Sequence, residues 1–223
     1  KYHEEYYHPS NSYIYIYGDM DVNERLEYLD REYLSDFDVS DVDIHANIER
    51  QAAFDKPVYE TKPYAITEDE SLEDNTYLSY NAVIGTSVDA KLYLAFQILD
   101  YALVMTPGAP VKQALLDAGI STDVYSSYET SLYQPVYSIV AKNSNSKEQD
   151  RFVSVINDTL EKLVKDGINE RTIEAGINYY EFKYREADYG PYPKGLMYYL
   201  TMMDSWLYDE TKPFIHIEAG DTF

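Results

Sequence analysis

The chain has 223 residues, contains no cysteine and carries a formal net charge of -22 at pH 7. The lack of cysteine excludes disulfide bonds, thiolate catalysis and zinc sites built from Cys. The excess of acid argues against binding to nucleic acid or to an anionic membrane, because a phosphate surface would be repelled. Twenty-six tyrosines against seven phenylalanines predict a core made largely of half-buried phenol rings.

The overall composition favours a protein of the intracellular, reducing compartment, and we expect it in the cytoplasm. No uninterrupted apolar run approaches the roughly 20 residues of a membrane span, so no membrane partner is expected. Lys1 is not an initiator methionine. We therefore expect the chain to be a fragment of a longer protein.

The first third of the sequence predicts two strands and one helix. Tyr and Ile alternate from Ser12 to Gly18, the period-two pattern of a strand with both faces covered. Capping side chains in Asp19–Asn23 introduce a helix that we expect to pack on this strand. Its apolar residues recur at helical spacing: Leu26, Leu29, Tyr33 and Phe37. Val58–Ile66 is predicted to be a strand that carries Pro63 at a sheet edge or at a strand end.

The middle of the sequence predicts two helices between strands. Tyr77–Ile84 alternates apolar and polar residues, and Asp89 is placed to cap a long core helix. The apolar stripe of that helix consists of Leu92, Ala95, Phe96, Leu99, Ala102 and Leu103. Thr106–Pro110 breaks the helix, a short second helix ends at Gly119, and strands follow near Asp123–Leu132 and Pro135–Lys142.

The last third predicts three helices. Ser146–Gln149 matches a capping box, and helical periodicity continues from it to Gly167. Asn169 caps the next helix, which we expect to end at Tyr189–Pro193, where Pro193 begins the last one. Paired strands alternating with helices favour an α+β two-layer sandwich in which a mainly antiparallel sheet packs against helices.

A polar stripe runs along the helix that follows Asn169. Asn178, Glu181 and Arg185 lie on it, beside an apolar face made by Ile173, Ile177, Tyr180 and Tyr184. Glu181 precedes Arg185 by four residues, the favourable order for a helical ion pair worth about 0.2–0.5 kcal/mol if exposed. We expect Glu181 and Arg185 to be partly buried and to fix the helix pair or a contact with another domain. Asn178, Glu181 and Arg185 are the structural or interface candidates.

The sequence provides no catalytic motif. His3 and His8 flank two glutamates, but a spacing of five turns the second imidazole by roughly 140° on a helix, away from a shared metal. His45 and His216 stand alone and are expected to be solvated or hydrogen-bonded. Nucleophile elbows and phosphate loops are missing, so no catalytic and no metal-ligating residue is predicted.

Five stretches of the sequence belong together when they are compared as a set. They are His8–Asp19, Gly108–Gly119, Gln134–Ile139, Asn178–Glu186, and Pro193–Leu196 with Trp206–Tyr208. In this order they resemble the presequence-protease subgroup of the pitrilysin/insulinase-type zinc peptidases. The likeness covers nearly the whole chain apart from residues 37–75 and the last ten.

The resemblance implies a metallohydrolase domain fold like that of the mitochondrial processing peptidase. In that family four α+β domains form two halves that close over an unfolded peptide, and the first domain carries an HxxEH zinc site. Our chain resembles the second, non-catalytic domain of the N-terminal half. It has neither HxxEH nor the distal glutamate, so no zinc-ligand or catalytic role is transferred to it.

Several expectations follow from that resemblance. Residues 1–223 form one domain of a longer parent chain, and residues 208–223 extend toward the next domain. The implied partners are the catalytic domain and the C-terminal half of the parent chain, together with peptide substrates. Zinc is expected in the catalytic domain and no cofactor here, so the fragment alone is predicted to be inactive. A stand-alone peptide-binding or scaffold module of the same fold is the alternative.

Overall fold

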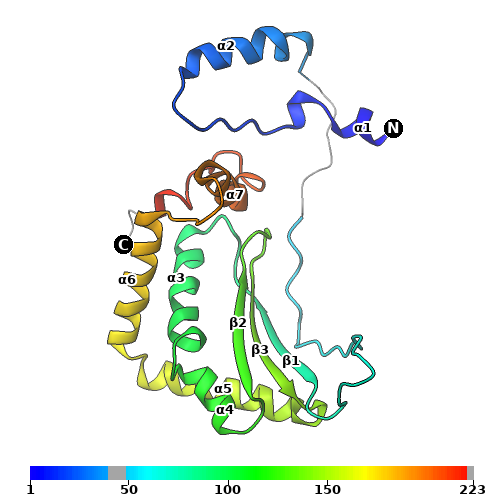
Figure 1. Cartoon of the computed structure of the whole chain (residues 1–223), viewed down its shortest axis with the longest axis vertical. Helices are drawn as coiled ribbons and strands as arrows, with labels where there is room; N and C mark the ends of the chain where they lie inside the picture. Colours follow the sequence, from blue (N-terminus) through cyan, green and yellow to red (C-terminus); the bar gives the residue numbers. More distant parts are fainter. Residues whose placement is uncertain (40–48, 220–223) are drawn as a thin grey trace. The chain divides into compact units, whose positions relative to one another are not determined.

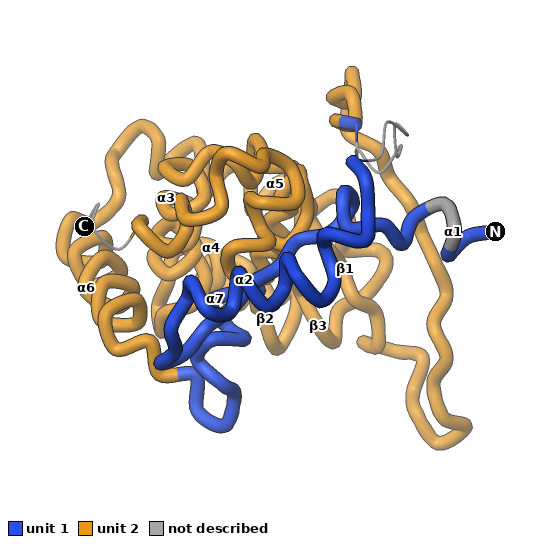
Figure 2. Tube along the Cα trace, turned by 90° about the horizontal axis from the view of Figure 1, so that it is seen from above, with its two compact units in different colours: residues 1–49, 189–200 blue, residues 50–188, 201–223 orange. Residues whose placement is uncertain are grey.

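The computed structural model of the protein describes residues 1–39 and 49–219. Contacts divide the chain into two compact units (Figure 2). Unit 1 comprises residues 1–49 and 189–200, and unit 2 comprises residues 50–188 and 201–223. The expectation of a single domain over residues 1–223 stays a prediction.

Unit 2 contains a three-stranded antiparallel sheet in the order β1-β3-β2 (Figure 1). The strands are β1 (Thr76–Val83), β2 (Asp123–Glu129) and β3 (Val136–Ser144). Ile139 on the central strand β3 is in register with Tyr80 of β1 and with Ser126 of β2. The burial of β3 alternates along the strand, as expected when one face of a sheet meets a core. The predicted α+β architecture with an antiparallel sheet is confirmed.

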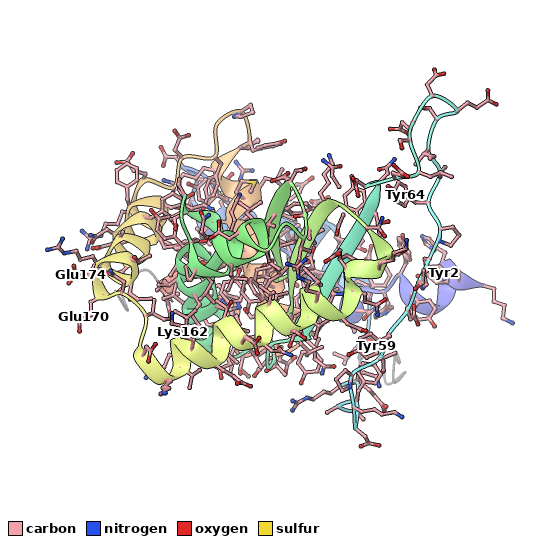
Figure 3. All side chains as sticks on the ribbon, turned by 90° about the horizontal axis from the view of Figure 1, so that it is seen from below. Tyr2, Tyr59, Tyr64, Lys162, Glu170 and Glu174 are labelled. Atoms are coloured by element: carbon pink, nitrogen blue, oxygen red, sulfur yellow. The ribbon has the colours of Figure 1, made fainter. Side chains whose placement is uncertain are left out.

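Two predicted strands do not form. Residues 12–17 and 57–66 are extended but belong to no sheet, so the described residues contain three strands rather than the four or five expected. Ile14 is 44% exposed and Val58 is 61% exposed. Alternation indicates only that a segment suits a pleated surface, whereas a strand also needs a hydrogen-bonding neighbour. Along residues 57–66, Figure 3 labels Tyr59 and Tyr64, and the Tyr64 hydroxyl donates to Asn75 Oδ1 at 2.8 Å.

The two central helices form as predicted, with one irregularity. Asp89 Oδ1 accepts from the Leu92 N–H at 3.0 Å and caps α3 (Ala90–Asp100). The helix continues as a wider π-helical turn over Tyr101–Met105 before α4 (Pro110–Asp117). Three successive residues of this turn, Ala102, Leu103 and Val104, are buried.

The core of unit 2 lies where α3, α4 and α5 (Gln149–Asp166) cover the sheet. Its buried members are Leu78, Leu103, Val104, Val111, Leu115, Ile120, Val124, Tyr137, Ile139, Ala141, Phe152 and Ile156. The capping box predicted at Ser146 is wrong in register. Asn145 Oδ1 accepts from the Lys147 N–H at 3.1 Å and caps a 3-10 turn, Ser146–Glu148, that leads into α5.

The stretch Ala90–Asp117 is long and apolar enough to pass as a membrane span by composition alone. It is not an uninterrupted apolar run, because Lys91 and Asp100 lie within it. Residues 106–109 interrupt it as a turn, and Val104, Val111 and Leu115 are at most 1% exposed within the core of unit 2. Burial against the sheet accounts for its apolar character, so the packing favours core helices.

Helix α6 (Glu170–Glu186) is capped by Asn169, as predicted, and packs on α3. It ends earlier than expected, because Ala187 adopts a left-handed conformation with φ 44°. Helix α7 (Lys194–Trp206) follows Pro193. Residues 208–219 then pack within unit 2, where the Tyr208 hydroxyl donates to the Ser131 carbonyl at 3.0 Å. The expectation that residues 208–223 extend toward a next domain stays a prediction.

Gly176 allows α6 to approach α3 closely. A Cβ added at Gly176 would lie 3.2 Å from the Tyr101 ring and 3.4 Å from the Ile98 carbonyl oxygen. We expect Gly176→Leu to lower the free energy of unfolding by about 1–3 kcal/mol, because the helices must separate. Urea denaturation measures this effect. Ala175→Leu, at the exposed neighbouring position, is the control, and an equal loss in both variants would contradict the close-packing account.

Unit 1 contains α1 (Tyr2–Tyr6), α2 (Val22–Glu32), two short 3-10 turns and the first turns of α7. The 3-10 turns are Pro9–Asn11 and Leu34–Asp36. Asp21 Oδ1 caps α2 by accepting from the Asn23 N–H at 2.9 Å and the Glu24 N–H at 3.1 Å. The helix was predicted to pack on a strand at residues 12–18, yet no residue of α2 is buried.

Candidate functional site

The three interface candidates of α6 lie together on its outer face. Asn178, Glu181 and Arg185 are spaced at i, i+3 and i+7, and Phe182 falls on the same stripe at i+4. We call these four residues the α6 outer stripe. The opposite face carries the buried residues Gly176 and Tyr180.

Glu181 and Arg185 pair with each other. Arg185 Nη2 lies 2.5 Å from Glu181 Oε1. The Glu181 side chain is 30% exposed, so it is partly buried as expected, whereas the Arg185 side chain is 74% exposed and the expectation that it is partly buried is wrong. The ion pair lies within one helix, so it adds only about 0.2–0.5 kcal/mol to that helix. Asn178 is exposed. Their role in a contact with another domain stays a prediction.

Phe182 is the member of the stripe that the sequence analysis did not single out. Its side chain is 66% exposed, an unusual position for an aromatic ring on a helix with a separate buried face. The sequence did contain a signal for Phe182: it follows Asn178 by four residues, which places both on the polar side of α6. Glu170 and Glu174, at the start of α6, point away from unit 2 (Figure 3). The outer surface of this helix therefore combines acidic side chains, the cations Arg171 and Arg185, and an exposed ring.

Two carboxyl groups, the buried Asp100 and the half-buried Asp204, are held by tyrosines. The Tyr137 hydroxyl donates to Asp100 Oδ1 at 2.8 Å. Asp204 Oδ2 accepts from the Tyr93 hydroxyl at 3.1 Å and from Thr130 Oγ1 at 3.2 Å. Burial raises the pKa of both carboxyls, although these hydrogen bonds act in the opposite direction. The arrangement supplies the partners that buried acids need and ties α3 and α7 to the sheet region.

His216 is neither solvated nor held by a side-chain hydrogen bond, which corrects the expectation of a solvated or hydrogen-bonded histidine: both ring nitrogens are buried with no hydrogen-bond partner among the described residues. It is fully buried and stacks on Tyr93, with the ring centres 3.9 Å apart. Burial lowers the pKa of the imidazole to about 4, and the main chain of Ser87 acts weakly in the opposite direction. The imidazole is therefore neutral at pH 7. Ser87 is also fully buried, so the pair cannot meet a substrate in this structure.

The N-terminal histidines have separate partners. His3 stacks on Tyr7 at 4.4 Å, whereas His8 Nδ1 accepts from the Ser10 N–H at 3.2 Å and its ring meets Phe37 edge-on. His45 lies outside the described residues. Among the side chains that the structure describes, no three His, Asp or Glu groups come together in a way that could hold a metal. The described residues therefore do not fit a zinc centre, and no chemical step is assigned to them.

A hollow in unit 1 is also unsuited to acid–base chemistry. It has a volume of about 380 Å³ and is lined by Tyr15, Tyr17, Pro193, Lys194, Gly195, Leu196 and Tyr199. Lys194 is the single ionised group in that lining at neutral pH. The hollow can accept apolar or aromatic groups, but it offers no pair of groups for proton transfer.

Comparison with known proteins places these features in context. The family described as the peptidase M16 inactive domain matches residues 1–180. The chain is 43% identical over 218 residues to Protein HypA of Clostridium perfringens, covering 98% of this chain and 22% of that protein. It is 33% identical over 211 residues to presequence protease 1, chloroplastic/mitochondrial, of Arabidopsis thaliana, covering 94% of this chain and 19% of that protein.

One solved structure shows the same fold. It is described as a candidate zinc protease from Bordetella pertussis Tohama I, and it aligns with a TM-score of 0.52 at 13% identity, covering 66% of this chain and 79% of that one. The chain spans about a fifth of the length of the two curated relatives named above.

Proposed function

Since the chain belongs to the family of peptidase M16 inactive domains, we propose that it serves as the non-catalytic domain of a longer zinc-dependent metalloendopeptidase. The family match is the observation that carries this proposal. In this role the domain packs against a catalytic domain and forms part of the wall of a chamber in which peptides are degraded. In this proposal the zinc is held by the catalytic domain.

The outer stripe of α6 supports a packing role. A two-thirds exposed Phe182 beside a salt-bridged Glu181–Arg185 pair provides an aromatic anchor with a polar rim, the composition typical of protein interfaces. We propose that this stripe contacts the remainder of the protein, either its catalytic domain or its C-terminal half. Asn178 extends the polar rim toward the start of the helix.

The charge of the chain suggests the class of substrate. With a net charge of -22, a surface facing the chamber would attract basic, unfolded peptides and repel acidic ones. The attraction is electrostatic, so it weakens as salt shortens the screening length. We propose the cytoplasm as the site of action.

The test uses the intact protein that contains this chain. We expect it to cleave unfolded peptides, to lose this activity on chelation and to regain it with zinc. We expect a basic peptide to be cleaved with a higher kcat/KM than an acidic peptide of equal length, and the difference to shrink at high salt. Cleavage that survives chelation would contradict the metallopeptidase assignment. A protein that binds peptides without cleaving them would favour the scaffold alternative.

Phe182→Asp in the intact protein tests the packing role. Burying a carboxylate in place of an aromatic anchor should lower kcat/KM by about tenfold or more, corresponding to at least 1.4 kcal/mol of lost contact. Val164→Asp on α5, where the side chain is 88% exposed, is the matched control and should leave kcat/KM within about twofold. Equal effects of the two variants would contradict an interface at the α6 outer stripe.

A further inference from the structure

The extended segment of unit 1 contacts α7 through its tyrosine rings, and it stays largely accessible, since even Tyr17 is 52% exposed. The rings of Tyr15 and Tyr17 lie against those of Tyr199 and Tyr198, with centres 5.3 and 5.8 Å apart. Gly195 makes room for this contact, because an added Cβ would overlap the Tyr17 ring. Successive side chains of an extended chain point to opposite sides. Ile14 and Ile16 therefore face away from α7, and they are 44% and 39% exposed.

The main chain of this segment is also unpaired. Within the described part of the chain, no backbone hydrogen bond joins residues 14–17 to another segment. Main-chain N–H and C=O groups in an extended run bearing apolar side chains form a ready template for pairing with a neighbouring strand. Alternating Tyr and Ile suits such a strand, since β-branched and aromatic residues fill a pleated surface. The segment thus has the backbone and side chains of a strand but no sheet.

The helix that follows, α2, also exposes apolar side chains. Gly18, with φ 140°, turns the chain toward the Asp21 cap of α2. Helix α2 has 11 residues, and none of them is buried. Its apolar residues Val22 and Leu26 are 57% and 53% exposed. A helix this short gains most of its stability from packing an apolar stripe, not from propensity alone. Strand and helix are one strand-turn-helix unit whose apolar sides are both uncovered.

The length of the relatives and the charge of the chain indicate what covers this unit. In Protein HypA the matching region makes up 22% of the protein, so most of that protein lies outside it. A second copy of this chain is a poorer partner, because each copy carries a net charge of -22 and two copies repel each other. A neighbouring sheet of the same protein brings an apolar layer and a strand edge without that repulsion between separate molecules.

We propose that Ile14–Tyr17 pairs as a β-strand with the edge of a sheet in the remainder of the same protein, and that α2 packs on that sheet. Ile14 and Ile16 enter the apolar layer of the partner, while Tyr15 and Tyr17 keep their contact with α7. The inference rests on the proposed function in one respect, namely that the chain works as part of a longer protein. It identifies residues 14–32 as a segment through which the domain is joined to its partner by main-chain pairing as well as by side chains.

Hydrogen exchange on the intact protein, without substrate, tests the pairing. We expect amides in residues 14–17 to exchange at least about 100-fold more slowly than those of an unstructured peptide, since exchange from a strand requires local opening. Ile16→Asp should return these amides, and those of α2, toward the unprotected rate. Leu72→Asp, at a position 85% exposed in a loop of unit 2, should leave them protected. Unprotected amides in the unsubstituted protein would overturn the proposal.

Two further measurements distinguish the alternatives. Protection that appears only as protein concentration rises, together with a dimer in light scattering, would identify a second copy as the partner and overturn the proposal. Protection in a monomeric intact protein that lacks zinc-dependent peptidase activity would support the pairing and contradict the proposed function alone. An active zinc-dependent peptidase in which the amides of residues 14–17 are unprotected would contradict the pairing and support the proposed function.

Discussion

Replacing Phe152 with alanine is expected to lower the free energy of unfolding of unit 2 by about 3–5 kcal/mol, because truncation leaves a cavity as well as removing buried apolar surface. Phe152 is 2% exposed and lies in the core formed by α3, α4, α5 and the sheet. Few single changes cost more in a domain whose total stability is typically 5–15 kcal/mol.

Val164 on the same helix provides the control for Phe152→Ala. Its side chain is 88% exposed, so Val164→Ala should change the free energy of unfolding by no more than about 0.5 kcal/mol. Urea denaturation followed by circular dichroism gives both values. A loss below about 1.5 kcal/mol for Phe152→Ala would contradict the central packing role assigned to α5.

Acidification should destabilise unit 2 through His216. Burial places the folded-state pKa of this imidazole at about 4, below its ordinary value of 6.5. The unfolded chain therefore binds the proton more strongly than the folded one. The stabilising contribution is complete above pH 6.5 and is lost progressively as pH falls toward 4. A pKa shift of that size corresponds to a total loss of about 3 kcal/mol in the free energy of unfolding, of which about 2 kcal/mol is lost by pH 4.5.

His216→Phe isolates this effect. Phenylalanine can keep the stack on Tyr93 but cannot take up a proton, so the variant should lose about 2 kcal/mol less than the wild type between pH 7 and pH 4.5. Asp100 and Asp204 act in the opposite direction, since their raised pKa values favour proton binding by the folded state. They are present in both proteins and cancel in the comparison. Parallel pH profiles of the two proteins would contradict the buried, neutral state of His216.

The regular elements of unit 2 were predictable where one local signal coincided with tertiary packing. Asp89 caps α3, Asn169 caps α6, and Tyr77–Ile84 corresponds to β1 within a residue or two at each end. In these places capping chemistry and apolar periodicity specified the same backbone that the core required. Ser146 failed as a cap because Asn145, one residue earlier, also carries a capping side chain.

The candidate site was only partly visible in the sequence. Helical spacing placed Asn178, Glu181 and Arg185 on one stripe, which the structure retains. It did not reveal the exposure of Phe182, because periodicity shows which residues share a face and not what that face meets. The burial of His216 was equally hidden, since a lone histidine in a sequence has no recognisable environment.

The sequence by itself determined the chemistry that this chain lacks and the elements it builds: no cysteine, no HxxEH motif, and a series of capped helices beside alternating strands. Tertiary structure decided which alternating segments became strands. Residues 76–83 found β3 as a neighbour, whereas residues 12–17 found none within the described chain. The physical reason is that a helix satisfies its main-chain hydrogen bonds internally, but a strand satisfies them only through a partner that its own sequence does not contain.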